Sequence, residues 1–264
     1  QSSSWQLPKK ILSADTNKAY PMWKRARNCF ESIMKKYILE SSMAAQDSLK
    51  EYSLFDKPVY LLADLPEHLD LIRVLSAIEN KIFRSLTGNF ENIYVGQFDD
   101  FESDGRHFNA LYKDGTIYVS ATQDDDADMI DDIVHEIAHS LEKSNYEEIY
   151  GDHALEKEFL AKRKYLYHLA PTKKRANLVY FLNPDYDVNF DMYLYKDLGY
   201  DLLRVLASEL FYSPYAITAL KEYWANGFEH YFLGDKQKLK DISPILYNKI
   251  VNLIEFKKEE NNEL

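Results

Sequence analysis

The sequence feature that most constrains this chain is a five-residue stretch, His135-Glu136-Ile137-Ala138-His139. Residues four apart in an α-helix lie above one another on the same face, so both imidazoles can reach one metal ion. Glu136 lies beside them on the rim of that face. This H-E-x-x-H arrangement offers two histidine ligands for zinc and a glutamate that can accept a proton from water. The stretch therefore predicts a helix that presents a metal site.

The residues around the stretch also predict a helix with one buried face. Apolar side chains recur at helical spacing, at Ile130, Ile133, Val134, Ile137 and Leu141. Aspartates crowd residues 124–132, where the helix dipole favours negative charge, and Lys143 and Asn145 indicate the end of the helix. The two histidines lie away from the apolar stripe. The alternative interpretation is a pair of histidines on a solvated face.

Composition excludes several classes of protein. The chain has 264 residues and a net charge of −11, from 32 Lys and Arg against 43 Asp and Glu. A chain this acidic is repelled by nucleic acid, so we expect no nucleic-acid partner. No apolar run approaches the roughly 20 residues of a membrane helix, so we also expect no membrane partner and a soluble chain.

Cysteine usage and the first residues leave the compartment open. Cys29 is the only cysteine, which excludes an intrachain disulfide and a cysteine zinc site. No signal peptide is visible, and the chain begins at Gln1 rather than Met. Both a cytoplasmic and a secreted location agree with these observations, and the oligomeric state is not predicted.

Hydrophobic periodicity predicts an α+β fold that is mostly helical and has a small mixed sheet. Residues 1–20 are expected to be a flexible tail, 21–256 a single domain, and 257–264 a second tail. Helices are expected at 21–52, 66–88, 152–169, 200–211, 214–233 and from 241 or 244 to 256. Strands are expected at 58–62, 92–98, 108–112 and 116–120, the last two forming a hairpin around Lys113-Asp114-Gly115.

The strand predicted at 116–120 directly precedes the helix of the H-E-x-x-H stretch. An edge strand can pair with an extended peptide through backbone groups alone. We therefore consider 116–120 as a substrate-binding edge, with an ordinary buried strand as the alternative.

A catalytic zinc site needs a third protein ligand and an open position. The metzincin pattern requires His at 145 and Gly at 142, but these positions hold Asn and Glu. The other common arrangement takes a glutamate from a later helix. In the predicted helix 214–233, Tyr215, Glu222 and Glu229 are spaced by seven and share one face. Glu222 is the expected ligand, Glu229 its nearest competitor, and Glu158 a weaker one.

Other residues of the predicted helix 214–233 suggest how it packs. Ala225 and Gly227 keep the helix slim, so it can approach the H-E-x-x-H helix closely. Asn226, one turn after Glu222, is expected to accept a hydrogen bond from a ligand histidine. Tyr215 can present its hydroxyl to the same cleft, although Tyr212 lies nearby in the sequence. The remaining histidines are expected to be ordinary surface or core residues: His68, His107, His153, His168 and His230.

The segment Tyr215-x6-Glu222-Tyr-Trp-Ala-x-x-Phe228, placed after an H-E-x-x-H helix, resembles the gluzincin metallopeptidases of the anthrax lethal factor and Pro-Pro endopeptidase type. The resemblance implies a zincin-like catalytic domain with one Zn²⁺ per chain. His135 and His139 match the zinc histidines and Glu222 the third ligand. Glu136 matches the general base, and Tyr215 matches a tyrosine that faces the active site.

The chain departs from this group in two places. The group often has an acidic residue where Asn226 stands, and the stretch between His139 and Glu222 is long for it. Residues of about 145–210 are therefore expected to form an insertion with its own role.

The function expected from these residues and this resemblance is that of a zinc-dependent endopeptidase acting on protein or peptide substrates. Metal-activated water would attack the peptide bond, with Glu136 as the general base. One alternative is a metal-dependent hydrolase of a non-protein amide. Another is a non-enzymatic, zinc-stabilised binding or structural module of a larger assembly. A structural zinc site is usually closed by a fourth protein ligand, and no cysteine or evident extra histidine supplies one.

Overall fold

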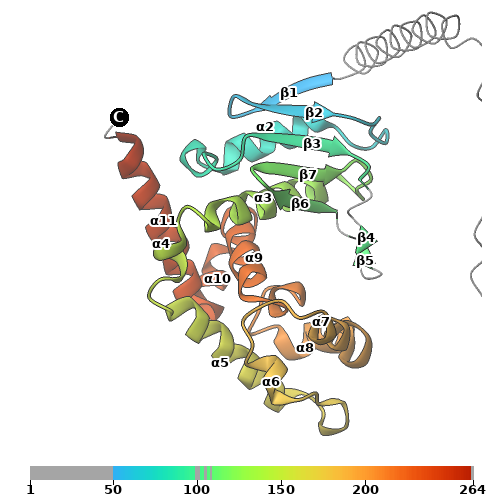
Figure 1. The fold of residues 1–264 in the computed structure, drawn as a ribbon, viewed down its shortest axis with the longest axis vertical. Helices are drawn as coiled ribbons and strands as arrows, with labels where there is room; N and C mark the ends of the chain where they lie inside the picture. The colour runs from blue at the N-terminus through green and yellow to red at the C-terminus, as the bar shows by residue number, and fades with distance from the viewer. Residues whose placement is uncertain (1–49, 99–101, 104–105, 108, 263–264) are drawn as a thin grey trace, which may run out of the picture. The chain divides into compact units, whose positions relative to one another are not determined.

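A mixed five-stranded sheet forms one side of the described structure (Figure 1). The computed structural model describes residues 50–98, 102–103, 106–107 and 109–262. The strands are β1 (Lys50–Leu54), β2 (Lys57–Leu61), β3 (Asn92–Gly96), β6 (Ala110–Lys113) and β7 (Thr116–Ser120). Their order is β1-β2-β3-β7-β6, with the three inner strands parallel and the two outer strands antiparallel to their neighbours.

The strand register separates an apolar face of the sheet from an aromatic one. Val59, Ile93 and Ile117 lie beside one another on the three parallel strands, and all are fully buried. The next residues along the strands form a row of stacked tyrosines, Tyr60, Tyr94 and Tyr118, which are half-buried. Successive side chains of a strand point to opposite faces, so only the first set joins the core.

Helices make up most of the remaining described residues. The longer ones are α2 (Leu71–Lys81), α3 (Asp126–Glu142), α5 (Ala154–Leu169), α9 (Leu220–Leu233) and α11 (Pro244–Asn262). Shorter segments are η1 (Arg84–Leu86), α4 (Tyr146–Tyr150), η3 (Thr172–Lys174), α6 (Leu178–Phe181), α7 (Val188–Met192), η4 (Tyr193–Gly199), α8 (Tyr200–Ala207), η5 (Tyr215–Ile217) and α10 (Lys236–Ile242). The two-residue strands β4 (Glu102–Ser103) and β5 (Arg106–His107) pair with each other.

Helix α3 lies between the sheet and α9 and contacts both (Figure 1). The carboxylate of Asp125 accepts hydrogen bonds from the backbone N–H groups of Ala127 and Asp128, which caps the start of the helix. Ile133, Val134, Ile137 and Leu141 are fully buried, as the apolar stripe predicts. The packing of this stripe fixes how the opposite side of α3 is presented.

The structure confirms an α+β fold with a small mixed sheet. It also confirms the hairpin of β6 and β7, whose turn residues Asp114 and Gly115 have φ values of 50° and 84°. A turn with positive φ at both central positions matches the twist of the two strands. None of the described helices combines the length and apolar character that a membrane span requires.

Element boundaries near both ends of the described chain differ from the prediction. Residues 50–52 begin strand β1 rather than ending a helix, because they pair with Tyr60 and its neighbours in β2. The rest of the helix predicted at 21–52, and the tail predicted at 1–20, lie outside the described residues. Helix α2 is shorter than the predicted 66–88, and α11 continues to Asn262 instead of ending near Phe256.

Two corrections affect the site. Strand β7 is not an edge, because it pairs with β3 on one side and β6 on the other. The helix predicted at 214–233 is broken at Ala219, whose backbone is extended (φ −152°, ψ 159°). Tyr215 therefore lies in the short turn η5, whereas Glu222 and Glu229 lie on α9.

Candidate metal centre

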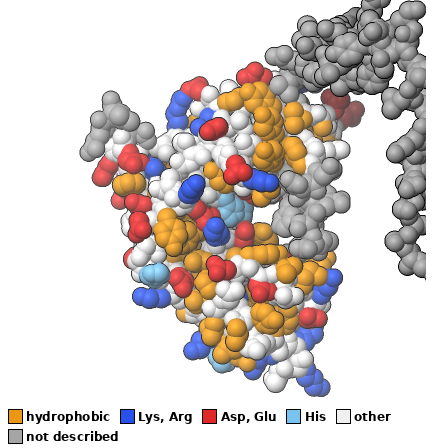
Figure 2. Space-filling model, viewed as in Figure 1, with side chains coloured by type: hydrophobic (Ala, Val, Ile, Leu, Met, Phe, Trp, Pro, Cys, Tyr) orange, Lys and Arg blue, Asp and Glu red, His pale blue; other side chains and the backbone are white. Residues whose placement is uncertain are grey.

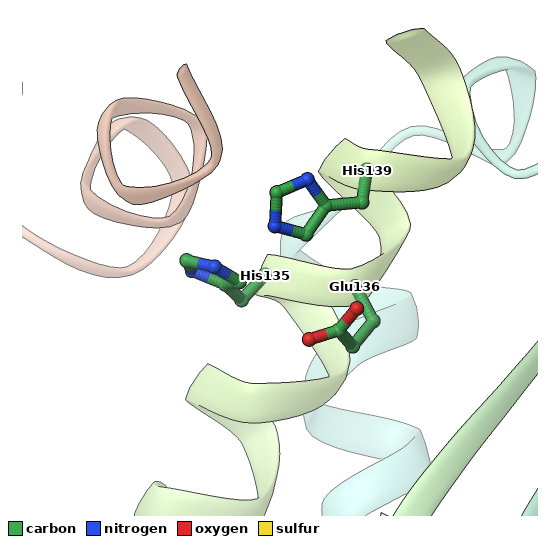
Figure 3. A group of neighbouring side chains, drawn as sticks. All are labelled: His135, Glu136 and His139. Carbon is green, nitrogen blue, oxygen red and sulfur yellow. The ribbon is translucent and has the colours of Figure 1, made fainter. Parts of the chain in front are cut away.

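Helix α3 presents the three residues of the H-E-x-x-H stretch together. Ligand atoms of His135, Glu136 and His139 all lie within 4.8 Å of one another. Figure 3 shows the two imidazole rings on the same side of α3, with the carboxylate of Glu136 beside them. The ring centroids of the histidines are 4.9 Å apart. The side chains of His135 and His139 are 13% and 18% exposed, so the site is recessed but reachable.

Glu222, from α9, meets both histidines. Its Oε2 atom lies 3.1 Å from Nε2 of His135 and 3.6 Å from Nε2 of His139. Two ligand atoms of a tetrahedral zinc ion are about 3.3 Å apart when the bonds are about 2.0–2.1 Å long. The two separations lie on either side of this value, so Glu222 fits a zinc ligand in its chemistry and in its spacing from each histidine.

Packing between α9 and α3 fixes the position of Glu222. The indole N–H of Trp224 donates a 3.2 Å hydrogen bond to the backbone oxygen of Ala138, and both residues are fully buried. Gly227, which was expected to let α9 approach α3, instead faces α11. A Cβ atom at Gly227 would lie only 2.3 Å from Leu246 Cδ2.

A second carboxylate contacts the far side of each histidine. Nδ1 of His139 is 2.6 Å from Oε1 of Glu142, and Nδ1 of His135 is 3.4 Å from Oε2 of Glu229. A carboxylate at Nδ1 favours the tautomer with the proton there and leaves Nε2 free to bind a metal. Glu229 is thus in a supporting position rather than competing with Glu222. Asn226 does not contact a histidine through a hydrogen bond but donates to Glu229 at 3.4 Å.

These carboxylates dominate the electrostatics of the site. Burial alone would lower the pKa of His135, but hydrogen bonds with Glu222 and Glu229 raise it to about 9. Burial alone would also lower the pKa of His139. Hydrogen bonds with Glu142 and Glu222 outweigh this effect and raise the pKa well above its usual value. Burial would raise the pKa of Glu222, yet the two histidines hold it well below its ordinary range. The site is therefore built to hold a positive charge, whether protons or a metal ion.

Glu136 is oriented by the neighbouring strand. Its Oε2 atom accepts a 2.6 Å hydrogen bond from the backbone N–H of Tyr112 in β6. The residue is 7% exposed, and this burial raises the pKa of its carboxyl above the ordinary value. Strand β6, rather than the predicted β7, is the edge strand of the described sheet that adjoins the site.

Tyr215 reaches the site although it is not on α9. Its ring centroid is 6.2 Å from that of His135, and burial followed by the charge of Glu222 raises the pKa of its phenol. The backbone N–H of Leu220, at the start of α9, donates to the oxygen of Pro184, which ties the break before α9 to a distant loop. The structure therefore brings together all five predicted residues: His135, Glu136, His139, Tyr215 and Glu222.

The remaining candidates have other partners. Glu158 accepts hydrogen bonds from the backbone N–H groups of Ile245 and Leu246 and from the Tyr223 hydroxyl, so it caps the start of α11. Tyr212 stacks on His230, with ring centroids 3.8 Å apart. The contact of Glu142 with His139 is not among the interactions predicted from the sequence. The position of Glu142 three residues after His139, on the same helix face, is the signal that identifies it.

Comparison with known protein families, with curated proteins and with solved structures gave no match.

Proposed function

We propose that this protein is a zinc-dependent endopeptidase of the gluzincin type, with a zincin-like fold. One observation carries the proposal: Glu222 Oε2 lies 3.1 and 3.6 Å from the Nε2 atoms of His135 and His139, while Glu136 stands beside them on the same helix. Three such ligands leave a fourth tetrahedral position for water or substrate, which is the arrangement of catalytic rather than structural zinc.

His135, His139 and Glu222 would hold the ion. Zinc in such a site supplies Lewis acidity, which promotes ionisation of a water molecule and polarises a peptide carbonyl. Glu136 would accept the proton of the attacking water and then deliver it to the leaving amine. Burial raises the pKa of Glu136 above its ordinary value, which strengthens this carboxylate as a proton acceptor. The Tyr215 hydroxyl, protonated because its pKa is raised, would donate to the developing oxyanion.

The substrate would bind as an extended strand along β6. As one of the two edge strands of the described sheet, β6 can add a peptide through backbone hydrogen bonds. Tyr112 belongs to this strand and contacts Glu136, so a peptide paired with β6 would pass beside the general base. In the space-filling view, histidine side chains are visible in a hollow near the centre of the described part, with hydrophobic side chains below it (Figure 2).

A broad peptide library tests the proposal. The full chain is stripped of metal with a chelator, and cleavage of the library is followed by mass spectrometry before and after one equivalent of zinc is restored. We expect internal peptide bonds to be cut only by the restored protein. Zinc binding without cleavage of any peptide would overturn the peptidase assignment. It would favour a zinc-stabilised module or a hydrolase of other amides.

A further inference from the structure

Glu142 and Tyr150 form a buried pair directly behind His139. Glu142 is the last residue of α3 and Tyr150 the last of the short helix α4, and they are 6% and 7% exposed. The Tyr150 hydroxyl donates a 3.1 Å hydrogen bond to Oε2 of Glu142, while Oε1 of the same carboxylate lies 2.6 Å from His139 Nδ1. A chain of two hydrogen bonds therefore leads from α4 to one of the metal-binding imidazoles.

A charged side chain as buried as Glu142 is stable only when both oxygens have partners. Without the Tyr150 hydroxyl, the nearest remaining partner of Oε2 is the ammonium of Lys221, which lies 3.9 Å away. The Lys221 side chain is 73% exposed. That distance is too long for a hydrogen bond and the lysine is well solvated, so Tyr150 is the principal partner. Burial raises the pKa of Tyr150 well above its ordinary value, which keeps its hydroxyl a donor.

The packing of α4 determines where this hydroxyl lies. The side-chain amide of Asn145, itself buried, donates a 2.7 Å hydrogen bond to the backbone oxygen of Leu141 and joins α4 to the end of α3. Ile149 is fully buried, α4 contacts α11, and the Lys249 ammonium donates to the backbone oxygen of Glu148. The hydroxyl is thus placed both by the packing of α4 against α11 and by the attachment of α4 to the end of α3.

The supports of the two histidines are unequal. His139 has a 2.6 Å contact to a carboxylate that is itself hydrogen-bonded, whereas His135 has a 3.4 Å contact to Glu229. A histidine held firmly through Nδ1 loses less rotational freedom when Nε2 binds a metal, so its ligation is stronger. The Glu142 branch should therefore contribute more to metal affinity than the Glu229 branch.

We propose that Tyr150 is a positioning residue for the metal centre, acting through Glu142 to hold His139 in its ligating orientation. The inference rests on the proposed function, since it requires that His139 bind zinc. It assigns to the first helix of residues 145–210 a role in metal affinity, and it links that affinity to the packing of α4 on α11.

Tyr150→Phe tests the proposal because it removes only the hydroxyl. Tyr146→Phe is the matched control, since Tyr146 lies on the same helix and is 56% exposed. Its ring centroid is 5.5 Å from that of Tyr150. The zinc dissociation constant of each full-length variant is measured by competition with a chromogenic chelator, and the melting temperature of each metal-free protein is recorded. Loss of an outer partner typically weakens metal binding about 10–100-fold, and we expect the lower end, about 10-fold, for Tyr150→Phe.

The outcomes separate this inference from the proposed function. Weaker zinc binding by Tyr150→Phe, with Tyr146→Phe at the wild-type value, would support the inference. Equal zinc affinity in all three proteins would overturn it, even if the metal-free Tyr150→Phe variant melted earlier, since that result describes a purely structural hydroxyl. Failure of the wild-type protein itself to bind zinc would overturn the proposed function and this inference with it. Glu142→Gln is a second variant, and it should weaken zinc binding at least as much as Tyr150→Phe. A smaller loss would contradict the proposal that Tyr150 acts on His139 through Glu142.

Discussion

The backbone N–H of Tyr112 donates a 2.6 Å hydrogen bond to the carboxylate of Glu136. This contact joins edge strand β6 of the described sheet to the residue that we propose as the general base. It holds the carboxylate beside the two histidines through Oε2. In the proposed function, the strand that would pair with substrate is therefore the one that also orients Glu136.

Glu136→Gln should abolish peptidase activity without removing zinc. Glutamine retains the acceptor for the Tyr112 N–H but cannot take a proton, so turnover should fall by about 10²–10⁴-fold, the usual contribution of general acid–base catalysis. The check is kcat on a cleaved peptide together with zinc content. Turnover at the wild-type rate would rule out Glu136 as the base.

Glu222 and Glu229 should differ in their effects on zinc, because only the first contacts both Nε2 atoms. Glu222→Gln removes a ligand charge and should weaken zinc binding by more than the roughly 100-fold upper range for outer partners. Glu229→Gln should cost about 10-fold or less. Chelator competition compares the two variants, and a larger loss for Glu229→Gln would show that the roles are reversed.

Tyr215→Phe should lower kcat and leave zinc content unchanged. Removal of one oxyanion donor typically costs about 10²–10³-fold in kcat. Zinc should be retained because Tyr215 is not one of the proposed ligands, and its ring centroid is 6.2 Å from that of His135. Steady-state kinetics with Tyr212→Phe as the control measure the effect, since Tyr212 instead donates to the backbone oxygen of Asp235. Loss of zinc from Tyr215→Phe would indicate a structural role.

Much of this site follows from local sequence patterns. The spacing of His135 and His139 and the apolar stripe around them predict one helix with two distinct faces, and α3 has both. The hairpin could be predicted because Asp114-Gly115 supplies the backbone conformation that its turn requires. The pairing of Glu222 with the histidines followed from the requirement for a third ligand.

Other features depend on contacts that a local pattern does not contain. The order of strands in a sheet is set by long-range pairing, which a local pattern does not contain, so the prediction that 116–120 is an edge strand is wrong. The break at Ala219 lies in a run with helical spacing, and the site receives Tyr215 from a turn instead of from the predicted helix face. Gly227 lies within a stretch of sequence that is helical on both sides of it. Only the tertiary structure shows that it faces Leu246 rather than α3.

Gly227→Ala should destabilise the fold although alanine is the better helix former. The added Cβ would lie 2.3 Å from Cδ2 and 2.7 Å from Cγ of Leu246, which is 1% exposed, so its side chain can shift only by displacing its neighbours. Overpacking of this kind typically costs about 1–3 kcal/mol. Urea unfolding measures the loss. Gly88→Ala is the control, because no heavy atom lies within 4 Å of its added Cβ, and equal effects of the two substitutions would contradict the close contact of α9 with α11.

Lys162 should make stability depend on pH in the alkaline range. Its ammonium donates to the hydroxyls of Tyr223 and Ser243, but burial lowers its pKa from 10.5 to about 8. Between pH 8 and 10.5 the unfolded chain binds more protons at this residue than the folded chain. The stability of the folded state therefore rises with pH across that window, and the penalty present below pH 8 is at most about 3 kcal/mol.

Lys162→Met lacks this titration and keeps a side chain of similar length. Urea unfolding of both proteins at several values between pH 7 and pH 10.5 should show the wild type gaining stability relative to the variant as pH rises. Parallel pH dependences of the two unfolding free energies would contradict the assigned cause.

Zinc content is the measurement that tests the central claim most directly. The full-length protein is loaded with zinc, dialysed against metal-free buffer and examined by elemental analysis. We expect one zinc ion per chain, lost on substitution of Glu222 and retained on substitution of Glu136. A wild-type protein that retains no zinc after dialysis would show that His135, His139 and Glu222 do not form a zinc site, and would contradict the peptidase assignment.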